Sequence, residues 1–161
     1  MQNIQQLVGV SYQLAFALAD TAADVVEGKD SFEGEKQPVQ AMSRIYPNYT
    51  QVIARSDSGT TSIADMRGNR ISTGSPGSGT QVIARRLLES AGLNPQSDVA
   101  AQRLDLTKTV DGMKDGSIDA LFWSGGLPTP GITDITTQLV KMQDVSPASV
   151  WILRVTPNRC R

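Results

Sequence analysis

A loop rich in glycine and serine offers the clearest chemistry in this sequence. Residues 74–79 read Gly-Ser-Pro-Gly-Ser-Gly and stand between a predicted strand at 70–73 and a predicted amphipathic helix that follows. The N-terminus of a helix has unpaired N–H groups and a partial positive charge, so it attracts anions. Ser75, Ser78 and Thr80 would add hydroxyl donors, and Gly79 would let a ligand approach the backbone. The pattern favours a carboxylate or phosphate site, and the alternative is a tight turn with a serine cap.

The same loop lacks the residues that nucleotide chemistry needs. Gly74 and Gly79 have the spacing of a P-loop, but Thr80 and Gln81 stand where Lys and Ser/Thr are required.

The sequence contains no histidine, which excludes Ser-His-Asp and Cys-His catalysis. Cys160 is the single cysteine, so a thiolate metal cluster is excluded as well. We therefore expect anion binding without catalysis and without a cofactor. The alternative is a small α/β enzyme that uses this loop as an anion site.

A second candidate follows the predicted strand at 118–123. Trp123, Ser124 and Gly125 come at the carboxyl end of that strand, the edge at which open α/β sheets bind ligands. The tryptophan would form one wall of a small-molecule cleft. The alternative is a core tryptophan followed by a turn.

A third candidate lies where a short apolar strand at 14–18 meets a predicted helix at 22–26. Asp20 and Thr21 stand between them. Asp20 is either the N-cap of that helix, or it meets an ammonium or hydroxyl group of a ligand together with Thr21.

A break with a bend or a crossover is expected between predicted strands at 39–45 and 51–55. Pro47 lies there between two tyrosines, and a proline cannot donate to a strand ladder. Residues 28–37 are polar and predict a surface loop.

Strands alternate with helices along the chain, which favours an α/β fold with a mostly parallel sheet. Lysine and arginine number 15 against 16 acidic residues, so nucleic-acid binding is not expected. Asp111, Asp115 and Asp119 are predicted to form a solvated face and not an acid–base pair.

Linked motifs in the chain resemble the TAXI family of solute-binding proteins that serve TRAP transporters. The matching segments are residues 18–24 (LADTAAD), 44–52 (RIYPNYTQV), 72–80 (STGSPGSGT), 118–126 (IDALFWSGG) and 131–134 (GITD). The resemblance implies a periplasmic-binding-protein-like (type II) fold of two lobes with mixed, mostly parallel sheets. Members of the family are longer, so the fold is expected to be incomplete, with residues 1–50 in the first lobe, 51–144 in the second and 145–161 an atypical tail.

The resemblance also implies a function and a site. The protein would be a monomer in the periplasm that delivers a small carboxylate, such as glutamate, glutamine or a related dicarboxylate, to a TRAP membrane permease. Asp20 and Thr21 would contribute from the first lobe, with Tyr49 near the crossover between the lobes. The remaining ligand-binding residues would come from the second lobe: Ser75, Ser78, Gly79, Thr80, Trp123, Ser124 and Gly125.

Overall fold

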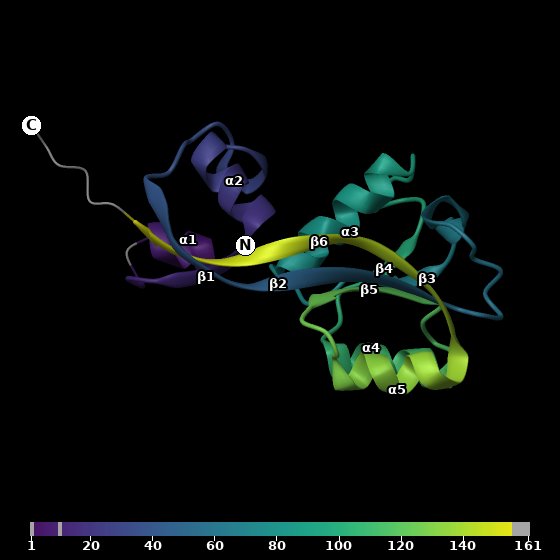
Figure 1. The fold of residues 1–161 in the computed structure, drawn as a ribbon. Coiled ribbons are helices and arrows are strands. Elements are labelled where there is room, and N and C mark those ends of the chain that lie inside the picture. The colour runs from purple at the N-terminus through teal and green to yellow at the C-terminus, as the bar shows by residue number, and fades with distance from the viewer. Residues whose placement is uncertain (1, 10, 156–161) are drawn as a thin grey trace, which may run out of the picture. The chain divides into compact units, whose positions relative to one another are not determined.

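Helices and strands alternate in the computed structural model, which describes residues 2–9 and 11–155, with side chains described up to residue 136. Figure 1 shows the elements, which in chain order are α1 (Gln2–Val8), β1 (Ala15–Leu18), α2 (Ala19–Glu27), η1 (Asp30–Phe32), β2 (Val39–Arg55), η2 (Ile63–Met66), β3 (Arg70–Ser72), α3 (Gly79–Ser90), β4 (Ala100–Gln102), α4 (Leu106–Asp115), β5 (Ala120–Gly125), α5 (Pro130–Leu139) and β6 (Val140–Val155). Across the described residues no helix has both the length and the apolar character needed to cross a membrane.

The described residues form two compact units. Unit 1 contains the chain up to Asn48 and from Pro147 on, and unit 2 contains Tyr49–Ser146. Strands β2 and β6 each begin in one unit and end in the other. Whether each unit is one lobe of a two-lobed receptor stays a prediction.

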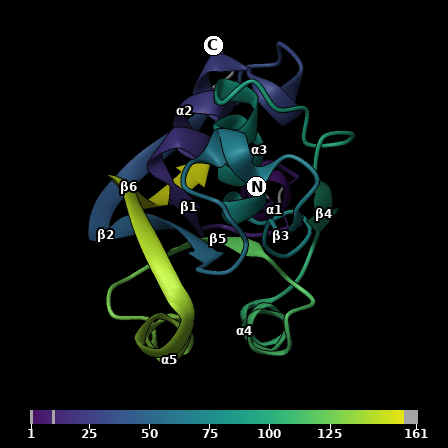
Figure 2. The same ribbon diagram turned by 90° about the vertical axis from the view of Figure 1, so that its right-hand side faces the viewer.

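Unit 2 is an α/β sandwich around a mixed sheet in the order β2-β5-β3-β4. Strand β3 is parallel to β4 and β5, and β2 is antiparallel to β5. Figure 2 shows α3 on one side of these strands and α4 and α5 on the other. Successive side chains of β5 point to opposite faces, so Ala120 and Phe122 pack in the cluster that includes α3, while Leu121 packs with α4 and α5. The predicted α/β class with a mixed sheet is confirmed.

Unit 1 is built on β1, which pairs antiparallel with β6. Helices α1 and α2 pack on one face of this sheet, where a buried cluster joins Ile4, Leu7, Ala15, Ala17, Val25, Phe32 and Val39. Phe32 comes from η1, so the segment 28–37, predicted as a surface loop, contributes a helical turn and a core side chain.

Two local predictions were wrong. The predicted break between two strands at residues 46–49 does not occur, because β2 runs without interruption through Pro47. Proline loses only its N–H and its fixed φ fits extended backbone, and Pro47 lies exposed in the strand. Asp20 is not the N-cap of α2, because Leu18 takes that position and Asp20 lies in the first turn.

One of the three aspartates expected on a solvated face has a structural role. The backbone N–H and Nε of Arg70 each donate to Oδ2 of Asp119 at 2.9 Å. These bonds join the first residue of β3 to the residue that precedes β5. The hydrogen bonds from Arg70 hold the pKa of Asp119 below its usual value. Asp111 and Asp115 are exposed, as expected.

Because the folded-state pKa of Asp119 is lowered, its ionised form stabilises the fold above the unfolded pKa of about 3.9, and this contribution is lost as pH falls through the folded-state value. We expect Asp119→Asn to destabilise the protein by about 1 kcal/mol at pH 7. The difference from wild type should shrink in melts at pH 3 and below. The exposed Asp111→Asn is the control, and a difference that does not change with pH would contradict the prediction.

Candidate functional site

The strand register of unit 2 brings three predicted site segments to one edge of its sheet. Ser72 of β3 lies beside Leu121 of β5, so the carboxyl ends of these parallel strands reach the same edge. Tyr49, in antiparallel β2, pairs with Gly125 at that edge. The loop that follows β3, the end of β5 and Tyr49 are therefore neighbours, although they lie far apart in sequence.

The glycine-rich loop leads from β3 into the N-terminus of α3. Ser78 is the N-cap of this helix, and its Oγ accepts a hydrogen bond from Gln81 N at 3.2 Å. In return, Oε1 of Gln81 accepts from Gly77 N at 2.9 Å. These two bonds fix the loop against the helix. The predicted serine cap is therefore present, and the N–H groups of Gly79 and Thr80 begin the helix without an intrahelical acceptor.

Thr80 packs closely against Gly74 of the glycine-rich loop. Its side chain is 8% exposed, and a Cβ built on Gly74 would lie 2.8 Å from the Cβ of Thr80. Gly74 also has a φ of +88°, which favours glycine. Thr80 is therefore nearly buried beside Gly74, whereas Ser75 is partly exposed.

Trp123 packs against the core of unit 2 and is partly exposed. Its ring packs beside the apolar cluster of α4 and α5, and its Nε1–H donates to Oγ1 of Thr129 at 3.1 Å. A Cβ built on Gly125 would lie 2.8 Å from Nε1 of Trp123, so the ring passes closely over Gly125. The indole thus packs against the core and remains partly exposed, and its role as a wall of a ligand cleft stays a prediction.

Gln51 of β2 is a buried polar residue beside Trp123, and the sequence analysis did not predict it as part of the site. It pairs with Trp123 across the β2–β5 ladder, so the two side chains share a face of the sheet. Gln51 is only 4% exposed, and its Oε1 has no hydrogen-bond partner among the described residues. No local pattern distinguishes it from an ordinary strand glutamine, because its burial comes from the register.

The candidates from unit 1 lie at the start of α2. Thr21 is 2% exposed, and its Oγ1 donates to Oδ1 of Asp20 at 3.4 Å. Asp20 lies in the first turn of the helix, where the helix dipole favours a carboxylate. Whether Asp20 and Thr21 meet the same solute as the residues of unit 2 stays a prediction.

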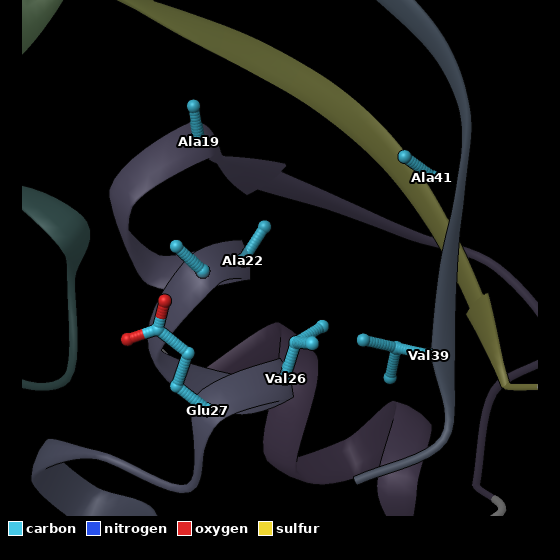
Figure 3. A pocket seen from close by; sticks show the side chains of 7 residues that line it. Ala19, Ala22, Val26, Glu27, Val39 and Ala41 are labelled. Atoms are coloured by element: carbon cyan, nitrogen blue, oxygen red, sulfur yellow. The ribbon is translucent and has the colours of Figure 1, made fainter. Parts of the chain in front are cut away.

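Unit 1 also contains a pocket of about 390 Å³ between α2 and the first part of β2 (Figure 3). Its lining residues are mainly alanine and valine: Ala19, Ala22, Ala23, Val26, Glu27, Val39 and Ala41. Glu27, its one carboxylate, forms an ion pair with Lys29. None of the predicted ligand-binding residues lines this pocket.

Comparison with known proteins adds two findings. The model of the NMT1-like family matches residues 1–150. Among solved structures, the periplasmic aliphatic sulphonate binding protein SsuA from Escherichia coli aligns with a TM-score of 0.63 at 16% identity, over 96% of this chain and 51% of that one. The alkanesulfonate-binding protein SsuA from Xanthomonas axonopodis pv. citri, bound to MOPS, aligns with a TM-score of 0.56 at 16% identity, over 94% and 50%.

An ancestral arginine-binding protein bound to arginine aligns with a TM-score of 0.61 at 10% identity, over 97% of this chain and 63% of that one. The chain thus spans from half to just under two thirds of the length of these structures. At these identities the likeness is one of fold, and it confirms the α/β fold of periplasmic binding proteins.

Proposed function

This chain belongs to the NMT1-like family, and from that premise we propose that it is a solute-binding component of a membrane transporter, or part of one. The proteins that share its fold are named as binding proteins for sulfonates and arginine. A binding role also agrees with a sequence without histidine and with a single cysteine.

The observation that carries the proposal is the meeting of three segments at one edge of the unit 2 sheet. The N-terminus of α3, the end of β5 and Tyr49 come together there through the strand register. Ligands of open α/β sheets bind outside the carboxyl ends of the strands. A solute at this edge would meet helix N–H groups from one side and an aromatic wall from the other.

The chemistry of this edge suits an anionic group held by neutral donors. The backbone N–H groups of Gly79 and Thr80, together with the hydroxyl of Ser75, would donate to the oxygens of a carboxylate. Trp123 and Tyr49 would cover an apolar part of the solute. Ser124 and Gly125 would line the end of β5, while Ser78 holds the loop in place as the helix cap.

We propose that the system served is a TRAP transporter of the TAXI type, because the motifs at 18–24, 44–52, 72–80 and 118–126 occur in the order and spacing of that family. In this proposal the protein acts in the periplasm and delivers its solute to a membrane permease. Asp20 and Thr21 of unit 1 would complete the site. Glutamate, glutamine or a related dicarboxylate is the proposed solute.

A sulfonate is the second candidate solute. Two proteins that share the fold are named as sulfonate-binding proteins, and a sulfonate presents oxygens to a helix N-terminus as a carboxylate does.

The test is a thermal-shift panel on the full chain with glutamate, glutamine, 2-oxoglutarate, succinate, phosphate, arginine and an alkanesulfonate. A ligand at 100 times its dissociation constant stabilises the folded state by about 2.7 kcal/mol, which raises the melting temperature by about 2–4 °C per kcal/mol at this size. One selective shift supports the proposal and identifies the solute class. A cooperative melt without any shift contradicts it, and chemical conversion of a bound solute would favour the enzyme alternative.

Trp123→Ala is expected to weaken solute binding about tenfold, because the variant loses an aromatic wall while the α3 N-terminus keeps its N–H groups. Titration calorimetry with the solute from the panel measures this loss. Trp123→Phe is the conservative control and should keep most of the affinity. If Trp123→Ala loses stability but binds the solute with wild-type affinity, the indole serves the core only.

A further inference from the structure

The indole of Trp123 is tied to the loop after β5 by a short chain of hydrogen bonds. Its Nε1–H donates to Oγ1 of Thr129 at 3.1 Å, and the Thr129 hydroxyl donates to the carbonyl oxygen of Gly126 at 2.8 Å. A hydroxyl has a single proton to donate. Because that proton goes to Gly126, the oxygen of Thr129 meets the indole as an acceptor.

Thr129 is itself anchored to a helix. It precedes Pro130, the first residue of α5, and its carbonyl oxygen accepts from Thr133 N at 2.9 Å. Helix α5 is packed in turn, because Ile132 and Ile135 are buried in the apolar cluster that it shares with α4. The acceptor for the indole N–H therefore belongs to a packed element of unit 2.

Gly125 places a second restraint on the same end of the indole. A Cβ built on Gly125 would lie 2.8 Å from Nε1 and 3.1 Å from Cε2 of Trp123, and the first distance is too short for a van der Waals contact. The ring therefore occupies room that exists because residue 125 has no side chain. The hydrogen bond to Thr129 and the close approach to Gly125 together define where the indole lies.

We propose that Thr129 is the positioning residue of Trp123 in the solute site. This inference rests on the proposed function, in which Trp123 covers an apolar part of the solute. By accepting from Nε1–H, Thr129 fixes the ring in one orientation over Gly125 and takes up the only hydrogen-bond donor of the indole. The ring then meets the solute with apolar surface, and the anionic group is left to the N–H groups of α3. A wall that is fixed before binding also lowers the entropy cost of ordering side chains around the solute.

Thr129→Val tests the positioning in the ligand-free protein, because valine has the shape of threonine but no hydroxyl. Thr129→Ser keeps the hydroxyl and is the matched control. Two-dimensional NMR resolves the indole N–H signals of the two tryptophans of the sequence, and the signal that is lost in Trp123→Phe belongs to Trp123. This signal should change its chemical shift and exchange about fivefold faster with solvent in Thr129→Val. It should stay close to its wild-type position in Thr129→Ser. Circular dichroism confirms that each variant folds.

Titration calorimetry with the solute from the thermal-shift panel tests the consequence for binding. Thr129→Val should weaken binding about fivefold, the effect of one neutral hydrogen bond, and Thr129→Ser should keep wild-type affinity. In a double-mutant cycle, Thr129→Val should not weaken Trp123→Ala any further, because it acts through the ring that this variant has lost. A merely structural role of Thr129 would lower the affinity of both backgrounds alike.

Three results would overturn the proposal: an unchanged indole signal in the folded Thr129→Val variant, wild-type affinity in that variant, or a fivefold loss that persists in the Trp123→Ala background. If no solute of the panel binds, the proposed function fails, and the indole signal then tests the positioning of the ring by itself.

Discussion

Gly79→Val is expected to lower the affinity for the solute by at least about 100-fold while the protein still folds. The valine would stand at the first position of α3, beside N–H groups that have no acceptor within the helix. Its branched side chain would hold an incoming carboxylate away from these donors. A hydrogen bond to a charged group is worth about 1.5–3 kcal/mol, and each 1.4 kcal/mol is a factor of ten in affinity. The loss of two such bonds accounts for the expected effect.

Titration calorimetry with the solute identified by the thermal-shift panel measures this change. Ala100→Val is the matched control, because it adds side-chain bulk at an exposed position of unit 2. Ala100 pairs with Arg70 at the amino end of β3, which is the edge of the sheet opposite to the candidate site. Wild-type affinity in Gly79→Val would remove the α3 N-terminus from the site.

Gly112→Val is expected to destabilise unit 2 by about 3 kcal/mol. Glycine is usually worse than other residues within a helix, by up to about 1 kcal/mol relative to alanine, so propensity alone predicts a small gain. At Gly112, however, a Cβ would lie 2.6 Å from Cγ1 of Ile118, which is fully buried. Overpacking of a core typically costs about 1–3 kcal/mol, and the methyl groups of valine add to the clash. The free-energy cost of the clash with Ile118 is therefore larger than the gain in helix propensity.

Thermal or urea unfolding measures this loss, and a fall in melting temperature of about 6–12 °C is expected at this size. Asp111→Val is the control in the same helix. Asp111 is exposed, and aspartate and valine have similar helix propensities, so the control should change stability by less than about 0.5 kcal/mol. Equal melting of the two variants would mean that α4 does not pack against Ile118 as the structure shows.

The elements of the fold were largely predictable from local sequence. The amphipathic spacing from Ile83 to Ala91 predicted a helix, and α3 spans Gly79–Ser90. Ser62 and Asp65 form a capping box at η2, and their spacing of three residues is a pattern that can be recognised in the sequence alone. These signals are local because caps and helix faces depend on residues within a few positions of one another. The sequence did not predict that β2 is continuous. The residues around a proline do not show whether a partner strand requires an N–H donor at that position.

The sequence by itself determined the alternation of strands and helices, the glycine-rich entry to α3 and the neutral, histidine-free chemistry of the candidate edge. Only the tertiary structure decided which polar groups are free to meet a solute. It packs Thr80 against Gly74 and buries Gln51 opposite Trp123. It also leaves the apolar side chains of Phe16 and Met42 exposed. The physical reason is that burial and pairing depend on strand register and on packing between distant segments, and neither is encoded in the spacing of neighbouring residues.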